Sequence, residues 1–126
     1  MQDKLKIYPI KCKTQYLEKI WGGQKIKNIL KQPVDNIDNC GEAWLFSSDD
    51  KYSSIIDNGH YKGTPLDILT IKYPDEILGT TGKRINKNQL PLLIKYIDAG
   101  QDLSVQVHPD DKVALKKHNS KGKTEM

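Results

Sequence analysis

Apolar and polar residues alternate strictly over residues 103–108 (Leu-Ser-Val-Gln-Val-His), and Pro109 follows them. Alternation with a period of two predicts a strand whose two faces differ. The aliphatic face is Leu103, Val105 and Val107, which suit a core, and the polar face is Ser104, Gln106 and His108. Three polar side chains on one face are costly to bury unless they meet water, a ligand or a metal ion. We expect the strand to end at Pro109, because proline cannot donate a hydrogen bond to a sheet.

Four further stretches have the residue pattern of strands: 5–10, 41–47, 52–57 and 90–98. The second and third are joined by the polar stretch Ser-Ser-Asp-Asp-Lys, which predicts a hairpin. In this hairpin Glu42, Trp44 and Phe46 are expected on one face. We expect Trp44 in the core and Glu42 as a paired carboxylate; the alternative is that Glu42 and Trp44 line a cavity. Residues 90–98 form the most apolar run and predict a buried strand.

Short helices are predicted between these strands. One lies within residues 23–30, and another begins at Thr64 and Pro65, which suit an N-cap and the first helical position. That second helix is expected to run to about residue 72, with a further turn over 74–79. Residues 110–118 predict a helix with acidic residues at its start and basic residues at its end, as the helix dipole prefers.

Glycine, proline, asparagine and aspartate mark the connections. Trp21-Gly22-Gly23 predicts a turn, and residues 32–39 and 79–88 predict loops. Several short strands with a few short helices between them predict a mainly β fold, either a barrel or a sandwich. The 126 residues are expected to form a single domain, 1–126.

Composition narrows the classes of protein. Apolar residues make up 37% of the chain, and no run of about 18 apolar residues is present, so no membrane span is expected. Met1 leads into no apolar segment, so we expect no secretory signal and a cytoplasmic location. The net charge is +4, but all except one of the 20 basic residues are lysine and they are scattered. We therefore expect neither a nucleic-acid partner nor a membrane partner.

The two cysteines, Cys12 and Cys40, are far apart in the sequence and form no C-x-x-C motif. A thiolate zinc site and a redox pair are therefore not predicted. In a reducing compartment a disulfide is not expected either, so we predict two unpaired, buried thiols.

The last five residues, Gly-Lys-Thr-Glu-Met, carry a second candidate for chemistry. If they form a strand, Lys123 and Glu125 share a face. Beside the first strand, three donors could then reach one ion: the Gln106 oxygen, a His108 nitrogen and a Glu125 oxygen. Mixed nitrogen and oxygen ligation without thiolate suits zinc or another divalent transition ion. Ser104 and Lys123 would stand nearby to hold an anionic substrate.

Six motifs occur in one order along the chain: Trp21-Gly22-Gly23, Gly41-Glu42-Ala43-Trp44, Asn58-Gly59, Pro91-Leu92-Leu93-Ile94-Lys95, Leu103–Asp110 and Gly122–Met126. In this order they resemble the N-terminal part of type I mannose-6-phosphate isomerases, from about residue 7 to the last residue. The Gln-Val-His-Pro and Lys-Thr-Glu-Met pair is the most specific of them.

The resemblance implies a cupin-type (jelly-roll) β barrel, incomplete at its C-terminus, with one zinc ion. It implies an enzyme that interconverts mannose 6-phosphate and fructose 6-phosphate, so a sugar phosphate is the expected partner. By resemblance Gln106, His108 and Glu125 bind zinc, and Ser104 and Lys123 line the sugar-phosphate pocket. Lys123 is the candidate catalytic residue, although the general base stays open between Lys123, a water on the metal and a group beyond the end of this chain.

Family members continue past the equivalent of Met126 and supply a further histidine ligand and an arginine. Arg84, His60 and His118 do not match these two residues in position. The chain is therefore expected to be an N-terminal piece with little activity alone. The alternative is a metal-binding or sugar-binding cupin module without catalysis. Simpler roles also stay open: Ser104 bonded to backbone, and Lys123 on a solvated surface.

Overall fold

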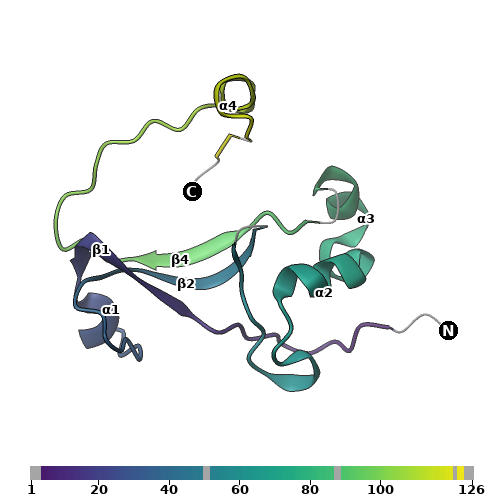
Figure 1. The fold of residues 1–126 in the computed structure, drawn as a ribbon. Helices are drawn as coiled ribbons and strands as arrows, with labels where there is room; N and C mark the ends of the chain where they lie inside the picture. The colour runs from purple at the N-terminus through teal and green to yellow at the C-terminus, as the bar shows by residue number, and fades with distance from the viewer. Residues whose placement is uncertain (1–3, 50–51, 87–88, 121, 124–126) are drawn as a thin grey trace.

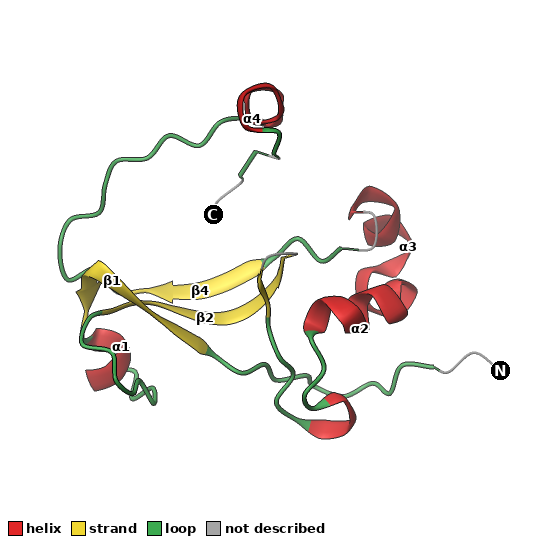
Figure 2. Ribbon diagram, in the orientation of Figure 1, coloured by secondary structure: helices red, strands yellow, loops and turns green. Residues whose placement is uncertain are grey.

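The computed structural model describes residues 4–49, 52–86, 89–120 and 122–123. An antiparallel sheet forms its centre, helices lie near both ends of that sheet, and the C-terminal helix lies apart from it (Figure 2). The strands are β1 (Gln15–Gly23), β2 (Cys40–Asp49), β3 (Tyr52–Ser53) and β4 (Leu93–Ile97). The helices are α1 (Lys25–Asn28), α2 (Leu66–Lys72), α3 (Pro74–Asn86) and α4 (Asp111–His118), with a 3-10 turn at Gly59–Tyr61.

Strand β2 is the centre of the sheet. It pairs antiparallel with β1 on one side and with β4 on the other, and its end forms a hairpin with β3. The hairpin and the mainly β class with short helices are confirmed. In the described part of the chain the strands do not close into a barrel, which agrees with the expectation of an incomplete one.

A β-bulge in β2 corrects one prediction about its faces. Trp44 lies opposite Lys95, but Phe46 lies opposite Ile94, so Leu45 is an extra residue in the ladder. Because Lys95 and Ile94 are consecutive in β4, they point to opposite faces. Phe46 therefore does not share a face with Trp44, and it packs with the cluster around Ile56 instead.

Two small hydrophobic clusters stabilise the fold. One joins the 3-10 turn and α2 to the N-terminal segment, and the other lies between α1, its following loop and β2. The first contains Cys12, Ile56, Tyr61, Leu66, Leu69 and Tyr73, and the second contains Ile26, Val34, Cys40 and Ala43. The prediction of two unpaired, buried cysteines is confirmed, and burial raises the pKa of both thiols.

The helix predictions for 23–30, 64–72 and 110–118 are confirmed, and the loop at 32–39 is also present. The loop predicted for 79–88 is wrong, because α3 continues to Asn86. Gly79 takes a positive φ of 67°, which a glycine adopts without strain, so the helix kinks there and resumes. Thr64 does not cap α2; Pro65 occupies the N-cap position. None of the described helices is long and apolar enough to span a membrane.

Two strand predictions and one turn prediction need correction, and the strand predicted for 52–57 is shorter, covering Tyr52–Ser53. Residues 5–10 form no strand; hydrogen bonds such as Lys6 N–H to the Tyr61 hydroxyl (2.8 Å) tie this segment to the 3-10 turn. Trp21-Gly22-Gly23 is the end of β1 and not a turn. The apolar run 90–98 contains β4, but that strand is not buried, with Ile94 52% and Ile97 54% exposed.

Asp98, directly after β4, links the strand to α1. Its buried carboxylate accepts hydrogen bonds from the backbone N–H groups of Lys25 and Ile26, the latter at 3.1 Å. Gly23 lies against this carboxylate so closely that a Cβ atom there would collide with it. Gly23 of the Trp-Gly-Gly motif is therefore needed for close packing between β1 and the residue that follows β4.

We predict that Asp98→Ala lowers the free energy of unfolding by about 2 kcal/mol, because the N–H groups of Lys25 and Ile26 lose their carboxylate acceptor and the second of them is buried. Urea unfolding followed by tryptophan fluorescence measures this change. Asp57→Ala is the matched control: its ion pair with Lys62 (3.2 Å) is exposed, so its loss costs less than about 1 kcal/mol. Equal costs for the two substitutions would contradict the prediction.

Candidate functional site

The segment that carries the first motif leaves the sheet after β4. Ala99 still forms a bridge with Gly22, and the chain then runs as an extended loop to α4 (Figure 1). The strand predicted for 103–108 is not present in the structure as described. Its aliphatic face is not in a core either, because Val105 is 98% and Val107 90% exposed. Alternation of apolar and polar residues specifies two faces, but a strand also needs a neighbouring strand with which its backbone exchanges hydrogen bonds.

The three polar residues of this segment, Ser104, Gln106 and His108, are all exposed. Gln106 donates a hydrogen bond from Nε2 to the Ser104 hydroxyl oxygen at 3.2 Å, so these two side chains lie together. The Gln106 amide oxygen is not used in this bond. This amide oxygen is the atom predicted to bind a metal ion, and the hydrogen bond to Ser104 leaves it out.

Helix α4 brings the chain back to the first motif. Its N-cap residue Asp110 accepts a hydrogen bond from the Val113 N–H at 2.8 Å, and Asn119 ends it in a left-handed conformation. The Gly122 N–H then donates to the Asp111 carboxylate at 2.9 Å. A Cβ atom on Gly122 would lie 2.8 Å from the Pro109 carbonyl oxygen.

The second motif therefore starts beside the place where the first one ends. Lys123, which is exposed, follows Gly122 directly and is thereby held near the end of the His108–Pro109 stretch. Residues 122 and 123 are not in a strand, and Glu125 lies outside the described residues. The structure thus joins Ser104 to Gln106 and anchors Gly122 at Pro109, while the position of the third predicted ligand is not described.

The described side chains include no group of three histidine, cysteine, aspartate or glutamate residues that could hold a metal ion. Gln106 and His108 nevertheless offer an amide oxygen and an imidazole nitrogen two residues apart on an exposed segment. With a carboxylate from Glu125 they would form an oxygen and nitrogen donor set without thiolate, which fits zinc.

A polar cluster on the sheet was only partly foreseen from the sequence. Glu42 accepts hydrogen bonds from Lys95 Nζ at 2.8 Å and from the Trp44 indole N–H at 2.7 Å. This confirms the prediction that Glu42 is a paired carboxylate. Its partner Lys95 is far away in the sequence, and only the pairing of Trp44 with Lys95 across β2 and β4 reveals the contact.

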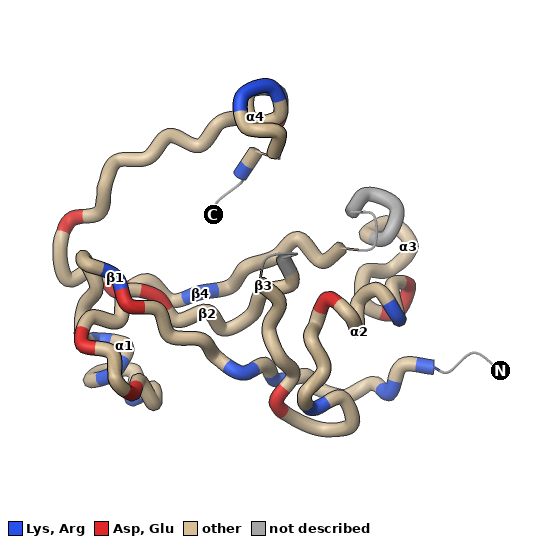
Figure 3. The backbone as a smooth tube through the Cα atoms, viewed as in Figure 1, with Lys and Arg blue, Asp and Glu red and all other residues tan. Residues whose placement is uncertain are grey.

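The electrostatics of Glu42 follow from this cluster. Burial alone would raise the pKa of Glu42, but the hydrogen bonds from Lys95 and Trp44 and the lysine charge outweigh burial and lower that pKa below its usual value of about 4.5. Other lysines are distributed over the N-terminal segment, α1 and α4 and do not gather on one element (Figure 3).

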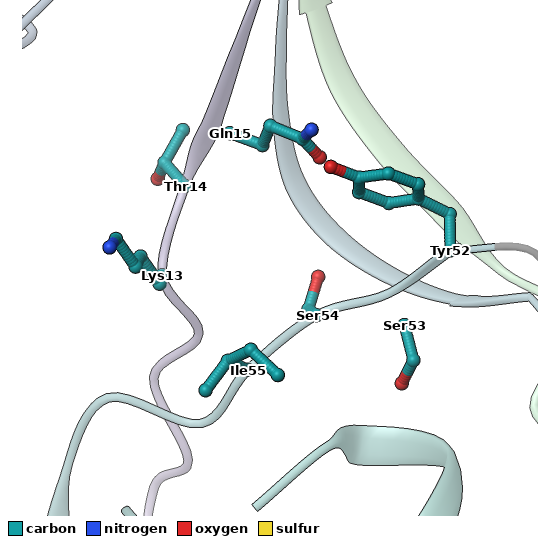
Figure 4. A pocket seen from close by; sticks show the side chains of 7 residues that line it. All are labelled: Lys13, Thr14, Gln15, Tyr52, Ser53, Ser54 and Ile55. Carbon is teal, nitrogen blue, oxygen red and sulfur yellow. The ribbon is translucent and has the colours of Figure 1, made fainter. Parts of the chain in front are cut away.

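A cavity of about 410 Å³ opens at the junction of β1 and β3 (Figure 4). It is lined by Lys13, Thr14, Gln15, Tyr52, Ser53, Ser54 and Ile55, none of which belongs to the predicted site. Two of its hydroxyls serve the fold, because Ser53 Oγ accepts from the Asp67 N–H and Ser54 Oγ from the Ser47 N–H, both at 2.9 Å. The cavity is therefore separate from the two motifs.

We predict that Lys95→Met lowers the free energy of unfolding by about 2 kcal/mol at pH 7, because it leaves the Glu42 carboxylate buried without its cation. A carboxyl group with a lowered pKa in the folded state contributes stability above its unfolded pKa, and this contribution is lost as the pH falls through the folded pKa. The cost of Lys95→Met should therefore be smaller at pH 3.5 than at pH 7.

Urea unfolding at both pH values measures this difference. Lys62→Met, which breaks the exposed pair with Asp57, is the control and should cost less than about 1 kcal/mol at either pH. A cost for Lys95→Met that does not change with pH would show that the Glu42 charge is not the cause.

Comparison with known proteins gives consistent matches over nearly the whole chain. The model of the phosphomannose isomerase type I catalytic domain matches residues 7–124. A mannose-6-phosphate isomerase of Streptococcus mutans is 37% identical over 117 residues, which is 93% of this chain and 35% of the relative. A probable mannose-6-phosphate isomerase of Bacillus subtilis is 36% identical over 94% of this chain and 36% of the relative.

The fold agrees with these matches. The crystal structure of the mannose 6-phosphate isomerase from Bacillus subtilis superposes with a TM-score of 0.76 and 32% identity, covering 90% of this chain and 35% of that one. The chain thus spans about a third of the length of the relatives that it matches. The sequence motifs, the fold and the family match agree, and the chain belongs to the type I phosphomannose isomerase family, within its catalytic domain.

Proposed function

We propose that this chain supplies metal-binding and substrate-binding residues of an enzyme that interconverts mannose 6-phosphate and fructose 6-phosphate. Family membership supports the reaction class. The observation that carries the assignment to residues is the contact of Gly122 with Pro109 and Asp111, because it holds the start of the second motif beside the end of the first.

In this proposal the Gln106 amide oxygen, a His108 ring nitrogen and the Glu125 carboxylate hold one zinc ion. A further histidine ligand is expected from the part of the family that this chain does not match. A zinc ion at this place supplies Lewis-acid polarisation of the sugar oxygens. The exposure of Gln106 and His108 leaves both side chains accessible to an ion.

The remaining residues of the two motifs would act on the substrate. Isomerisation moves a proton between C1 and C2 of the sugar, which requires a base and a group that stabilises negative charge on oxygen. The Lys123 ammonium attracts the sugar phosphate, and the same side chain is the candidate in this chain for proton transfer at C1 or C2. The Ser104 hydroxyl, already beside Gln106, donates a hydrogen bond to the sugar phosphate.

The second candidate function is a metal-binding or sugar-binding module without catalysis. It is favoured by the exposure of Ser104, Gln106 and His108, because an isomerase must orient its substrate and limit its contact with water. A coupled assay for fructose 6-phosphate separates the two functions. We expect very low turnover by the 126 residues alone, and clear turnover would exclude the module.

We predict that His108→Ala lowers the zinc affinity of the chain at least about 100-fold, because a ligand is removed and not merely a supporting contact. Isothermal titration with zinc at pH 7.5 measures the affinity. His60→Ala is the matched control, since His60 contacts Lys6 and Tyr61 far from both motifs in the sequence and should leave the affinity unchanged. Stoichiometric zinc retained by the His108 variant would refute the ligand assignment.

A second prediction concerns the anchor between the motifs. Gly122→Ala should weaken zinc binding about 10-fold although it removes no ligand, because a Cβ atom would push the chain away from Pro109 and Asp111. Asp111→Ala should act in the same direction by removing the acceptor of the Gly122 N–H. The same titration measures both variants, and Gly82→Ala in α3, where a Cβ atom would meet the Leu78 side chain at 3.2 Å, is the control. Unchanged affinity in both anchor variants would mean that Glu125 is not placed by this contact.

A further inference from the structure

The cavity at the junction of β1 and β3 has the size of a small-molecule site. Its volume of about 410 Å³ lies in the range of roughly 300–1,000 Å³ that such sites have, and it exceeds the roughly 30 Å³ of one water molecule. The Lys13 N–H donates to the Ile55 carbonyl at 2.8 Å, which joins the two walls. The Ser54 N–H donates to the Ser47 carbonyl at 2.8 Å, which ties the second wall to β2. The backbone therefore holds both walls in place.

Buried oxygen atoms without hydrogen-bond donors gather at this cavity. Four buried side-chain oxygens of the described residues have no hydrogen-bond partner, and three of them lie in or next to its wall: Gln15 Oε1, Ser48 Oγ and Asp67 Oδ1. Gln15 lines the cavity directly. Ser48 pairs with the lining residue Ser53 across β2 and β3, and the Asp67 N–H donates to the Ser53 hydroxyl. Because a buried acceptor without a donor is costly, this region favours a ligand that brings hydrogen-bond donors.

Other polar groups of the cavity can donate to a ligand. The Ser54 hydroxyl accepts one backbone N–H at 2.9 Å, and a hydroxyl that accepts still carries a proton to donate. Lys13 and Thr14 add an ammonium group and a further hydroxyl to the lining. In Figure 4 the Ser54 hydroxyl points into the space between the Gln15 amide and the Tyr52 ring. A ligand in this cavity thus meets hydrogen-bond donors and acceptors together.

Tyr52 gives the cavity an aromatic wall. Its ring stands edge-on to the Trp44 ring, with centroids 5.0 Å apart and an interplanar angle of 82°. The Trp44 indole N–H donates to Glu42 at 2.7 Å, so the ring that supports Tyr52 is itself held in place. Tyr52 is 38% exposed, which leaves part of its ring accessible to a ligand. The apolar C–H face of a sugar ring can pack on such a surface.

We propose that this cavity binds a neutral, unphosphorylated sugar at a site separate from Gln106 and His108. Each sugar hydroxyl both donates and accepts, so one ligand can donate to Gln15 and accept from Ser54 or Lys13. The terminal torsion of glutamine is soft, and its rotation turns the Gln15 amide oxygen toward the ligand. A phosphate dianion only accepts and would face the unpaired acceptors without a proton to share. An ammonium group only donates and would lie beside Lys13.

The test is an NMR titration of the isotope-labelled chain with mannose in the presence of EDTA, followed through the backbone amide shifts. EDTA removes zinc, so the candidate metal site does not contribute to the result. We expect saturable shifts at residues 13–15 and 52–55, with a dissociation constant of about 1 mM. Inorganic phosphate, the second probe, should cause no saturable shift at these residues.

Two variants test the groups that the proposal names. Gln15→Met keeps the length of the side chain but removes the amide, so mannose should bind at least about 5-fold more weakly. Because this change also removes an unpaired buried oxygen, the urea midpoint of unfolding should not fall. Tyr52→Leu removes the aromatic face and should weaken binding about 5-fold as well. Gln101→Met, at an exposed glutamine outside the cavity, is the matched control and should leave the affinity unchanged.

Four results would overturn the proposal. Absence of saturable shifts up to roughly 100 mM mannose, far above the expected dissociation constant, would show that the cavity holds water only. Shifts at residues 104–108 in place of the cavity residues would put the sugar elsewhere. Saturable binding of phosphate at the cavity, or a mannose affinity that neither Gln15→Met nor Tyr52→Leu changes, would contradict the sugar chemistry. Because zinc is absent throughout, failure of the metal site would leave this result unchanged.

Discussion

The hydrogen bonds of the buried Asp98 carboxylate to the N–H groups of Lys25 and Ile26 determine how the rest of the structure is arranged. They fix the end of β4 to the start of α1, and they require glycine at position 23 because no Cβ atom fits beside the carboxylate. The segment with the first motif starts at the next residue, so its point of departure from the sheet is fixed by this contact. A buried carboxylate without these two hydrogen bonds would be costly, so the contact stabilises the junction.

A second contact of the same kind fixes the position of the chain after α4, where Gly122 lies beside Pro109 and Asp111. The Asp111 carboxylate accepts the Gly122 N–H, and again a glycine is needed because the backbones lie too close for a side chain. Between the two anchors, residues 103–108 have no ladder partner in the described structure and expose their aliphatic side chains. A segment held only at its ends can adjust its backbone locally, which suits residues whose final geometry depends on an ion or on further chain.

Sequence patterns predicted the local elements well where the deciding interactions are local. The helix at 110–118 was predictable because Asp110 caps its own helix, and the hairpin at β2 and β3 because its turn residues are contiguous. The predictions were wrong or incomplete where contacts between residues far apart in the sequence determine the structure. Nothing near Leu45 in the sequence shows the bulge that moves Phe46 to the other face, and nothing near Glu42 identifies Lys95 as its cation. Of the candidate site, the contact between Ser104 and Gln106 follows from their spacing, but the anchor at Gly122 depends on the fold of α4.

The most informative disagreement is the strand predicted at 103–108. Its alternation is genuine, yet an extended chain becomes a strand only when another chain satisfies its backbone groups. Neighbouring β4 has the opposite property: it is a paired strand, but its apolar side chains are exposed on both faces. Both observations have one physical explanation, namely that these residues are patterned for a larger sheet than the described residues form. The amide and imidazole of Gln106 and His108 lie within that patterned segment, so burial of its aliphatic face and ordering of the candidate metal site are expected to occur together.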